Sequence, residues 1–426
     1  MIDTEKDTRK IVERALIIGL QDASCTAQEA EEHLIELKEL VKNLSIPIVD
    51  KLMVHLKKPN PKYLVGTGKA EEITQLAKEK NCDCLFFDCD LSPSQQRNWE
   101  KLTKICVIDR QEVIIDIFAS RASTKEAVLQ VELARLKYSM PRLTRAWTHL
   151  SRQYGGITGA RGEGEKQIEL DRQIIKHKIS QLEKELLDVR KHRDIQRKNR
   201  ERHGLSHAAI LGYTNAGKSS LLNALTSSNA LVENKLFATL DPLTRKAELP
   251  DNQNLLLTDT VGFVRKLPHN LVEAFKATLE EATLADFLLI VLDLGSSQIE
   301  EHWETTLSVL KELGADDKRK ILVFNKCDLN KDPVLMARLQ GIEGEKLFVS
   351  ALTGEGIGQL KSRLSEIVKE QSEKLSLRIP PARHDMASFA YEKGNVIKSE
   401  YDENGDLLLT VNVNMAHRKK FDEFVI

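Results

Sequence analysis

Apolar and polar positions alternate along residues 1–120 in the manner of a layered α/β domain. The short apolar runs have the length of buried strands and occupy residues 15–20, 49–56, 85–88 and 105–108. Two amphipathic stretches of helical period, 27–44 and 70–79, lie between these runs. Because strands and helices that alternate in this way pack as a sheet with covering helices, this segment is predicted to form an N-terminal α/β domain.

From Thr124 the period changes to that of long helices. Large apolar residues step by three and four through two runs: Leu129, Leu133, Leu136, Met140, Leu143, Trp147 and Leu150, then Ile175, Ile179, Leu182, Leu186 and Val189. Such spacing predicts a packing seam on each helix. Residues 121–205 are therefore predicted to form a long antiparallel helical hairpin, kinked at Pro141. Its reversal, residues 154–165, holds five glycines that no packing requirement explains.

Residues 206–372 return to short apolar runs separated by helical stretches. Strands are predicted at 208–211, 246–249, 254–257, 287–292, 321–324 and 346–349, and helices at 220–225 and 300–313. This order predicts a second α/β domain.

The last segment, residues 373–426, is predicted to be a small α+β C-terminal domain. Pro380 and Pro381 indicate a linker that begins near Ser376. Asn404-Gly405 separates two alternating runs, 395–401 and 406–413, which is typical of a hairpin turn. A closing helix is predicted over 416–424. Two interpretations of this domain stay open, a docking surface and a structural cap.

Composition places the chain among folded, water-soluble proteins. It has 426 residues, of which 41% are hydrophobic and 30% charged. The apolar runs, such as 287–292, are far too short to cross a bilayer, and the first residues carry no apolar signal region, so a cytoplasmic location is predicted. The six cysteines suit a reducing compartment. Cys82, Cys84 and Cys89 are interpreted as buried strand thiols rather than a metal site, because histidines and zinc-site spacing are missing.

Positive charge gathers in the predicted hairpin. Residues 137–202 contain 17 Lys and Arg against 9 Asp and Glu, whereas the whole chain has a net charge of −1. A solvated helical surface is the simpler interpretation. The concentration of charge around a glycine loop that carries Arg161 favours contact with nucleic acid, read through backbone and shape because few aromatic residues interleave it.

A phosphate-binding motif follows the predicted strand at 208–211. The segment from Gly212 to Ser219 matches GxxxxGK[ST] and opens a helix, which is the context such a loop requires. Backbone N–H groups would surround the phosphates, Lys218 would reach the β- and γ-phosphates, and Ser219 would give Mg²⁺ an oxygen. The predicted contacts are Gly212, Tyr213, Thr214, Asn215, Ala216, Gly217, Lys218, Ser219 and Ser220. By contrast, Gly66 and Gly68 lack this spacing and are interpreted as a turn that opens a helix.

Further elements follow in the order of a P-loop GTPase of the Ras-like kind. Phe237 and Thr239 lie in a polar stretch where Thr239 would give Mg²⁺ a second hydroxyl. Asp259 and Gly262 form an Asp-x-x-Gly motif, whose carboxylate would hold a magnesium-bound water and whose glycine N–H would meet the γ-phosphate. The predicted metal residues are therefore Ser219, Thr239 and Asp259. The predicted catalytic residues are Lys218, Thr239, Gly262 and Asn215.

The motif Asn325-Lys326-Cys327-Asp328 follows the predicted strand at 321–324. The two oxygens of Asp328 suit guanine, which offers the N1–H and the 2-amino group, whereas adenine offers no such pair. Ser350 and Ala351 follow the next strand, where a backbone amide would meet the guanine O6. The sequence therefore predicts a site for GTP and GDP.

The whole chain resembles the HflX family of ribosome-associated GTPases. Beyond the GTPase motifs, the resemblance rests on the hairpin loop, in which Gly155-Gly-Ile is followed by Arg161-Gly162-x-Gly164-Glu165-x-Gln167-x-Glu169-x-Asp171-Arg172. The chain departs from the expected pattern at Glu163 and Lys166. The resemblance implies a GTP hydrolase that binds the large (50S) ribosomal subunit and its rRNA and dissociates or rescues stalled ribosomes under stress, and we expect a monomer.

Phe263 occupies the position where many GTPases have a glutamine that orients the attacking water. A phenyl ring cannot hydrogen-bond water, so slow hydrolysis is predicted for the isolated chain. Two interpretations stay open: a nucleotide-binding timer, and an enzyme stimulated by a partner. The resemblance favours the second, and by analogy with GTPases that carry asparagine at the matching place, Asn215 is expected to help bind K⁺.

Two other functions compete with the ribosomal one. A tRNA-modifying GTPase would carry a cysteine near its C-terminus, whereas this sequence ends at Phe424-Val-Ile426. A GTP-dependent regulatory module acting on a non-ribosomal partner would share every nucleotide motif. Ribosome binding in the GTP state distinguishes that module from a ribosome factor.

Overall fold

The computed structural model describes most of the chain, in the ranges 12–23, 25–143, 161–201, 206–226, 236–237, 239–251, 253–265, 280–329, 332–370, 372–402, 404–414 and 417–426. The described residues divide into two compact units. One reaches Glu183 and the other begins at Lys184. The four-part domain division stays a prediction.

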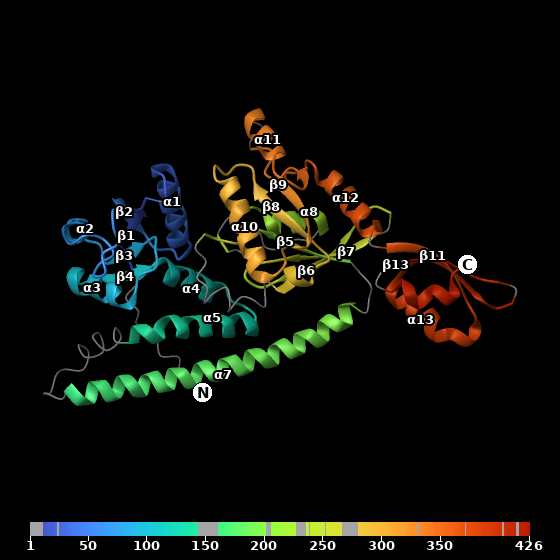
Figure 1. The fold of residues 1–426 in the computed structure, drawn as a ribbon, viewed down its shortest axis with the longest axis horizontal. Coiled ribbons are helices and arrows are strands. Elements are labelled where there is room, and N and C mark those ends of the chain that lie inside the picture. The colour runs from blue at the N-terminus through green and yellow to red at the C-terminus, as the bar shows by residue number, and fades with distance from the viewer. Residues whose placement is uncertain are drawn as a thin grey trace. The chain divides into compact units, whose positions relative to one another are not determined.

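The first unit contains a four-stranded parallel sheet with helices on both faces (Figure 1). The strands lie in the order β2-β1-β3-β4 and comprise β1 (Ala15–Gln21), β2 (Ile48–His55), β3 (Cys84–Phe87) and β4 (Cys106–Asp109). Leu16 and Ile18 of β1 share a core with Trp99. The alternate side chains of the strand point to the opposite face. The predicted α/β layers are confirmed.

Four helices accompany this sheet: α1 (Ala27–Asn43), α2 (Thr67–Glu79), α3 (Pro93–Thr103) and α4 (Arg110–Arg121). The hydrophobic pattern predicts the first two, and Gly66 is the N-cap of α2, as its interpretation as a turn requires. The helices α3 and α4 were not predicted, and both begin with local capping signals. Ser92 forms a capping box with Gln95, and the Asp109 side chain accepts from Glu112 N. These contacts satisfy N–H groups that the helix leaves unpaired.

Two helices form the seam region, α5 (Lys125–Ser139) and α7 (Arg161–Glu201), and α7 is the longest helix in Figure 1. Leu129 and Leu133 are buried on α5, and Leu182 and Leu186 on α7, as the seam predicts. Ion pairs join Lys178 to Glu132 at 2.5 Å and Lys137 to Glu183 at 3.0 Å.

One detail of the predicted hairpin is wrong, and the kink at Pro141 stays a prediction. α5 ends at Ser139 and passes into a 3-10 turn, Met140–Arg142, so the regular α-helix is interrupted at Pro141, and Leu143 is helical again. Proline has no N–H for the helical hydrogen bond. The predicted glycine loop ends early, because α7 begins at Arg161 and residues 161–165 are helical. The rest of that loop and the seam positions Trp147 and Leu150 lie outside the described residues.

The second unit is built on a six-stranded sheet in the order β10-β9-β8-β5-β7-β6. Its strands are β5 (Ser206–Gly212), β6 (Leu243–Glu248), β7 (Asn254–Asp259), β8 (Phe287–Asp293), β9 (Arg319–Asn325) and β10 (Glu345–Phe348). Only the β6–β7 pair is antiparallel among these. The helices are α8 (Lys218–Thr226), α10 (Ile299–Leu313), α11 (Pro333–Gln340) and α12 (Ile357–Glu370). The predicted multidomain α/β architecture is confirmed.

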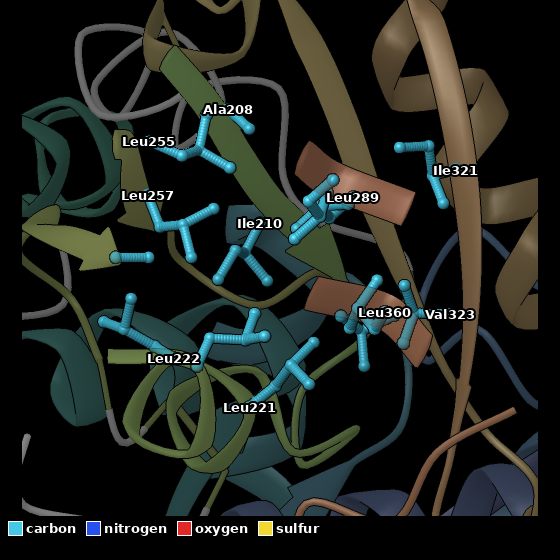
Figure 2. Close-up of a cluster of buried hydrophobic side chains, with 14 of the residues drawn as sticks. Ala208, Ile210, Leu221, Leu222, Leu255, Leu257, Leu289, Ile321, Val323 and Leu360 are labelled. Atoms are coloured by element: carbon cyan, nitrogen blue, oxygen red, sulfur yellow. The ribbon is translucent and has the colours of Figure 1, made fainter. Parts of the chain in front are cut away.

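An apolar core packs the helices against this sheet. Figure 2 shows Ile210 of β5 and Leu289 of β8 with Leu221 of α8 and Leu360 of α12, and all four are fully buried. Burying a side chain of this size contributes about 1.5–3 kcal/mol relative to leaving it exposed. The packing therefore holds the loop between β5 and α8 in place.

The C-terminal segment forms a three-stranded antiparallel sheet in the order β11-β13-β12. It comprises β11 (Ser372–Ile379), α13 (His384–Lys393), β12 (Gly394–Tyr401) and β13 (Leu407–Asn414). The predicted hairpin is confirmed as β12 and β13. The predicted linker from Ser376 is wrong, because Leu375, Leu377 and Ile379 alternate into the core and make this stretch a strand. The predicted closing helix is a 3-10 helix, Arg418–Phe424.

Candidate functional site

The phosphate loop runs from the end of β5 into α8 and has the backbone that a tight loop requires. Asn215 has φ +62° and Gly217 has φ +90°, both in the left-handed region. A side chain at Gly217 would place its Cβ 2.2 Å from Asn325 Nδ2, so only glycine fits there. Ser220 lies in the first turn of α8. The loop therefore presents consecutive backbone N–H groups at a helix N-terminus, an arrangement suited to phosphate.

Lys218 is buried at the base of this loop. Its Nζ donates to the Tyr213 carbonyl oxygen at 2.9 Å. Burial lowers the pKa of the Lys218 ammonium to about 8, and the neighbouring Asp259 carboxylate opposes that shift. A buried cation is costly unless an anion accompanies it. The site is therefore electrostatically prepared for a phosphate group.

Three oxygen-bearing side chains predicted to hold a metal meet beside Lys218. Ser219 Oγ donates to Asp259 Oδ2 at 2.6 Å, and Thr239 Oγ1 donates to the same oxygen at 2.9 Å. The second carboxylate oxygen, Asp259 Oδ1, is buried without a hydrogen-bond partner among the described residues. Burial raises the pKa of Asp259, and Lys218 and the two hydroxyls lower it. This all-oxygen donor set fits Mg²⁺.

Gly262 and Phe263 lie directly against the phosphate loop. Phe263 N donates to Gly212 O at 3.0 Å, and Thr214 N donates to Phe263 O at 2.7 Å. The Phe263 ring is only 1% exposed, so it packs into the domain and away from solvent. A Cβ on Gly262 would lie 2.8 Å from Lys218 Nζ, so a residue with a side chain at this position would crowd the ammonium group.

The side chains predicted to read the base gather at the ends of β9 and β10. Asn325 Nδ2 donates to Ala216 O at 2.9 Å, and Asn325 Oδ1 accepts from Ala351 N at 3.0 Å. Asp328 Oδ1 is buried without a hydrogen-bond partner in the part of the chain that the structure describes. Such an oxygen is suited to a ligand that brings N–H donors.

The structure uses three predicted site residues in ways that the pattern did not foresee. Ala351 N–H already braces Asn325, and Ser350 Oγ accepts from Thr353 N at 3.1 Å, so both support the neighbouring loop. The Phe237 ring is buried at 2% exposure and has φ +56°. These residues shape the site, and their contacts to a nucleotide stay predictions.

Two residues that support the loop, Asp293 and His302, were not predicted from the sequence. Lys326 Nζ donates to Asp293 Oδ2 at 2.6 Å and to Asn215 O at 2.9 Å, so Asp293 at the end of β8 helps to fix the loop. His302 of α10 stacks on Tyr213 with ring centroids 3.8 Å apart. Asp293 could have been predicted, because an aspartate at the end of a buried strand is a recognisable signal. No local signal in the sequence marks His302.

Cys84 is buried and begins β3, as the interpretation as a buried strand thiol predicts. Cys82 is buried and Cys89 is half-buried, and both lie outside that strand, so the interpretation is wrong for their place in the fold. In the described ranges, no group of three or more His, Cys, Asp or Glu side chains is placed to hold a metal ion. Within those ranges, no helix combines the length and the apolar character needed to cross a membrane.

Comparison with known proteins decides the family. Family models match residues 31–119 (GTP-binding GTPase N-terminal), 121–200 (GTP-binding GTPase middle region) and 207–326 (50S ribosome-binding GTPase). GTPase HflX of Akkermansia muciniphila is 47% identical over 431 residues, which cover 99% of this chain and 98% of the relative. GTPase HflX of Escherichia coli K12 is 40% identical over 389 residues, 91% of each chain. The chain belongs to the HflX family of GTPases.

Membership of the HflX family confirms the predicted activity, which is hydrolysis of GTP to GDP and phosphate by a domain of the ribosome-binding GTPase family. Among solved structures, the SsGBP complex with GDP is 25% identical and covers 84% of this chain and 99% of its own, with a TM-score of 0.48.

Proposed function

We propose that this HflX-family GTPase binds the large (50S) ribosomal subunit in its GTP state and dissociates or rescues stalled ribosomes under stress. It would act in the cytoplasm as a monomer. The observation that carries the proposal is the match of residues 207–326 to a family described as 50S ribosome-binding GTPase. The accumulation of Lys and Arg in residues 137–202 supports an rRNA partner, because phosphate groups dominate the affinity of proteins for nucleic acids.

The nucleotide is assigned to the loop and strand ends described above. Lys218 would neutralise the β- and γ-phosphates, Gly262 N–H would meet the γ-phosphate, and Asp328 would accept hydrogen bonds from guanine. Ser219, Thr239 and Asp259 would hold Mg²⁺ directly or through water, and when bound the ion neutralises charge on the phosphates. The contacts that Ser219 and Thr239 now make with Asp259 Oδ2 bring the required oxygens together.

The exposed lysines of α7 give the proposal a specific surface. Lys176 and Lys184 are solvent-exposed on this helix. Because these lysines are already exposed, they can contact rRNA phosphates without any rearrangement of the protein. A double Lys176→Glu, Lys184→Glu variant is therefore expected to lose ribosome binding in a salt-dependent manner, because each lost phosphate contact also reduces counterion release.

The test is cosedimentation and light scattering with purified ribosomes in the presence of GTP, a non-hydrolysable GTP analogue or GDP. The proposal predicts binding to the large subunit with GTP and with the analogue, weaker binding with GDP, and a fall in scattering as ribosomes dissociate. The matched control is a Lys246→Glu variant, which reverses the charge of an exposed lysine on β6 and leaves α7 unchanged. Binding to neither subunit would contradict the ribosomal role and favour a regulatory module with another partner.

We further propose that K⁺ stimulates hydrolysis through Asn215. This residue is exposed at the rim of the loop, and its side chain makes no hydrogen bond among the described residues, which leaves its carbonyl oxygen available to a cation. A monovalent cation beside the phosphates would stabilise the charge that develops in the transition state.

At constant ionic strength, the rate of GTP hydrolysis is expected to be about 100-fold higher in KCl than in NaCl, at the lower end of what one positioned electrostatic contact supplies. An Asn215→Ala variant should lose this difference and keep its affinity for GDP. Equal rates in the two salts, or an unchanged potassium response in the variant, would contradict the assignment.

A further inference from the structure

The hydroxyl group of Thr214 is a buried polar atom that the established activity does not yet explain. Thr214 lies in the phosphate loop and is 6% exposed. Its Oγ1 has no hydrogen-bond partner among the described residues. Leaving a buried hydroxyl unpaired costs about 1–3 kcal/mol. An unpaired group at a nucleotide site therefore points to a partner that arrives with the substrate.

The backbone on both sides of Thr214 is fixed. Thr214 N donates to Phe263 O at 2.7 Å, and Phe263 N donates to Gly212 O at 3.0 Å, so the loop and the Asp-x-x-Gly segment are joined at two points. With its backbone held, the side chain has only its χ1 rotation, and threonine is restricted at χ1. The hydroxyl is therefore presented by a rigid support.

The side chain of Thr214 lies where the γ-phosphate chemistry is expected. A Cβ built on Gly262 would be 2.8 Å from Thr214 Cγ2 and also 2.8 Å from Lys218 Nζ. The Thr214 methyl group and the Lys218 ammonium group are therefore both close to Gly262, and the Thr214 hydroxyl is bonded to the same Cβ as that methyl group. Because Lys218 reaches the terminal phosphates in a phosphate loop, Thr214 lies at the same end of the nucleotide.

The neighbouring position cannot supply this hydrogen bond. Phe263 has an apolar side chain, and its ring is packed into the domain at 1% exposure. A water molecule that attacks the γ-phosphate needs an acceptor or donor that fixes its orientation. At this junction, Thr214 carries a buried hydroxyl that has no hydrogen-bond partner among the described residues.

We propose that Thr214 is a catalytic residue whose hydroxyl accepts a hydrogen bond from the attacking water and so replaces the glutamine that position 263 lacks. In the step, the water oxygen bonds to the γ-phosphorus and the bond to the β–γ bridging oxygen breaks, with its electron pair going to GDP. The water protons leave with inorganic phosphate and the solvent, and Thr214 is unchanged. This rests on GTP binding at this site, but not on the ribosomal role.

The test compares kcat, KM and the Kd for GDP in Thr214→Val and Thr214→Ser proteins. Valine keeps the shape and removes the hydroxyl, so kcat should fall about 100- to 1000-fold, as for loss of one positioned catalytic group, while KM and the Kd for GDP stay within about threefold. Serine keeps the hydroxyl and should retain kcat within about fivefold. The matched control is Thr226→Val, which removes a hydroxyl that already donates to Leu222 O at 2.7 Å.

Full kcat in the valine variant would overturn the proposal. A loss of GDP affinity as large as the loss of kcat would also overturn it, because that result would show that the hydroxyl stabilises the loop and does not act in catalysis. These outcomes differ from a failure of the site itself, in which the Lys218→Ala protein would bind GDP as tightly as the unmodified chain.

Discussion

Replacing Lys218 with alanine is expected to weaken GTP binding by about two to three orders of magnitude, since a buried ammonium that pairs with phosphate is lost. In the structure the Lys218 ammonium is buried, donates to Tyr213 O and has its pKa lowered to about 8 by burial. The lowered pKa indicates that the protein alone compensates this charge incompletely. A bound polyphosphate would neutralise the remaining charge. Removing the Lys218 ammonium group should therefore weaken nucleotide binding and slow hydrolysis.

Calorimetric titration with GTP and GDP in the presence of Mg²⁺ measures this effect. A Lys246→Ala variant is a suitable control, because that lysine is exposed on β6 in the same domain. It should bind both nucleotides like the unmodified chain. If Lys218→Ala protein gave the same titration as the control, the phosphate-binding assignment would be wrong.

Replacing Asp328 with asparagine is expected to change the base preference of the site from guanine to xanthine. Asp328 Oδ1 is buried without a partner among the described residues, so it is available to the N1–H and 2-amino donors of guanine. Asparagine would set an amide donor against one of them and leave buried polar groups unpaired. Sites built to hydrogen-bond their ligand reject a mismatched analogue by about 10⁴- to 10⁵-fold, and a loss of GTP affinity of about 10²- to 10³-fold is expected here.

Xanthine carries a carbonyl oxygen at C2, which can accept from the new amide. The variant should therefore bind XTP more tightly than GTP, as measured by competition against a fluorescent nucleotide. An Asp317→Asn variant, which changes an exposed aspartate beyond α10, should keep the guanine preference. Undiminished GTP preference in the Asp328 variant would show that another group reads the base.

The sequence located most of the fold because strand and helix periods are local properties. The runs at 15–20 and 287–292 became β1 and β8 with boundaries shifted by one residue. α3 and α4 were missed although Ser92 and Asp109 cap them, since capping residues carry little hydrophobic periodicity. β11 was missed because the following prolines suggested a linker, whereas its pairing partner β13 lies about thirty residues further along the chain.

The candidate site was predictable to the extent that its residues occur in contiguous motifs. Asn325 and Ala216 are far apart in sequence and meet through a side-chain hydrogen bond that no local pattern encodes. The burial of Phe263 and the unpaired Thr214 hydroxyl likewise depend on how two distant segments face each other. Motifs fix which chemistry is present, and tertiary contacts fix which atoms remain available for it.

The most direct measurement of the central claim is a side-by-side calorimetric titration of the unmodified chain with GTP and ATP in the presence of Mg²⁺. A site in which Lys218 meets the phosphates and Asp328 reads the base predicts saturable, one-to-one binding of GTP and at least a hundredfold weaker binding of ATP, about 2.7 kcal/mol or more. Equal affinities for the two nucleotides would contradict the account.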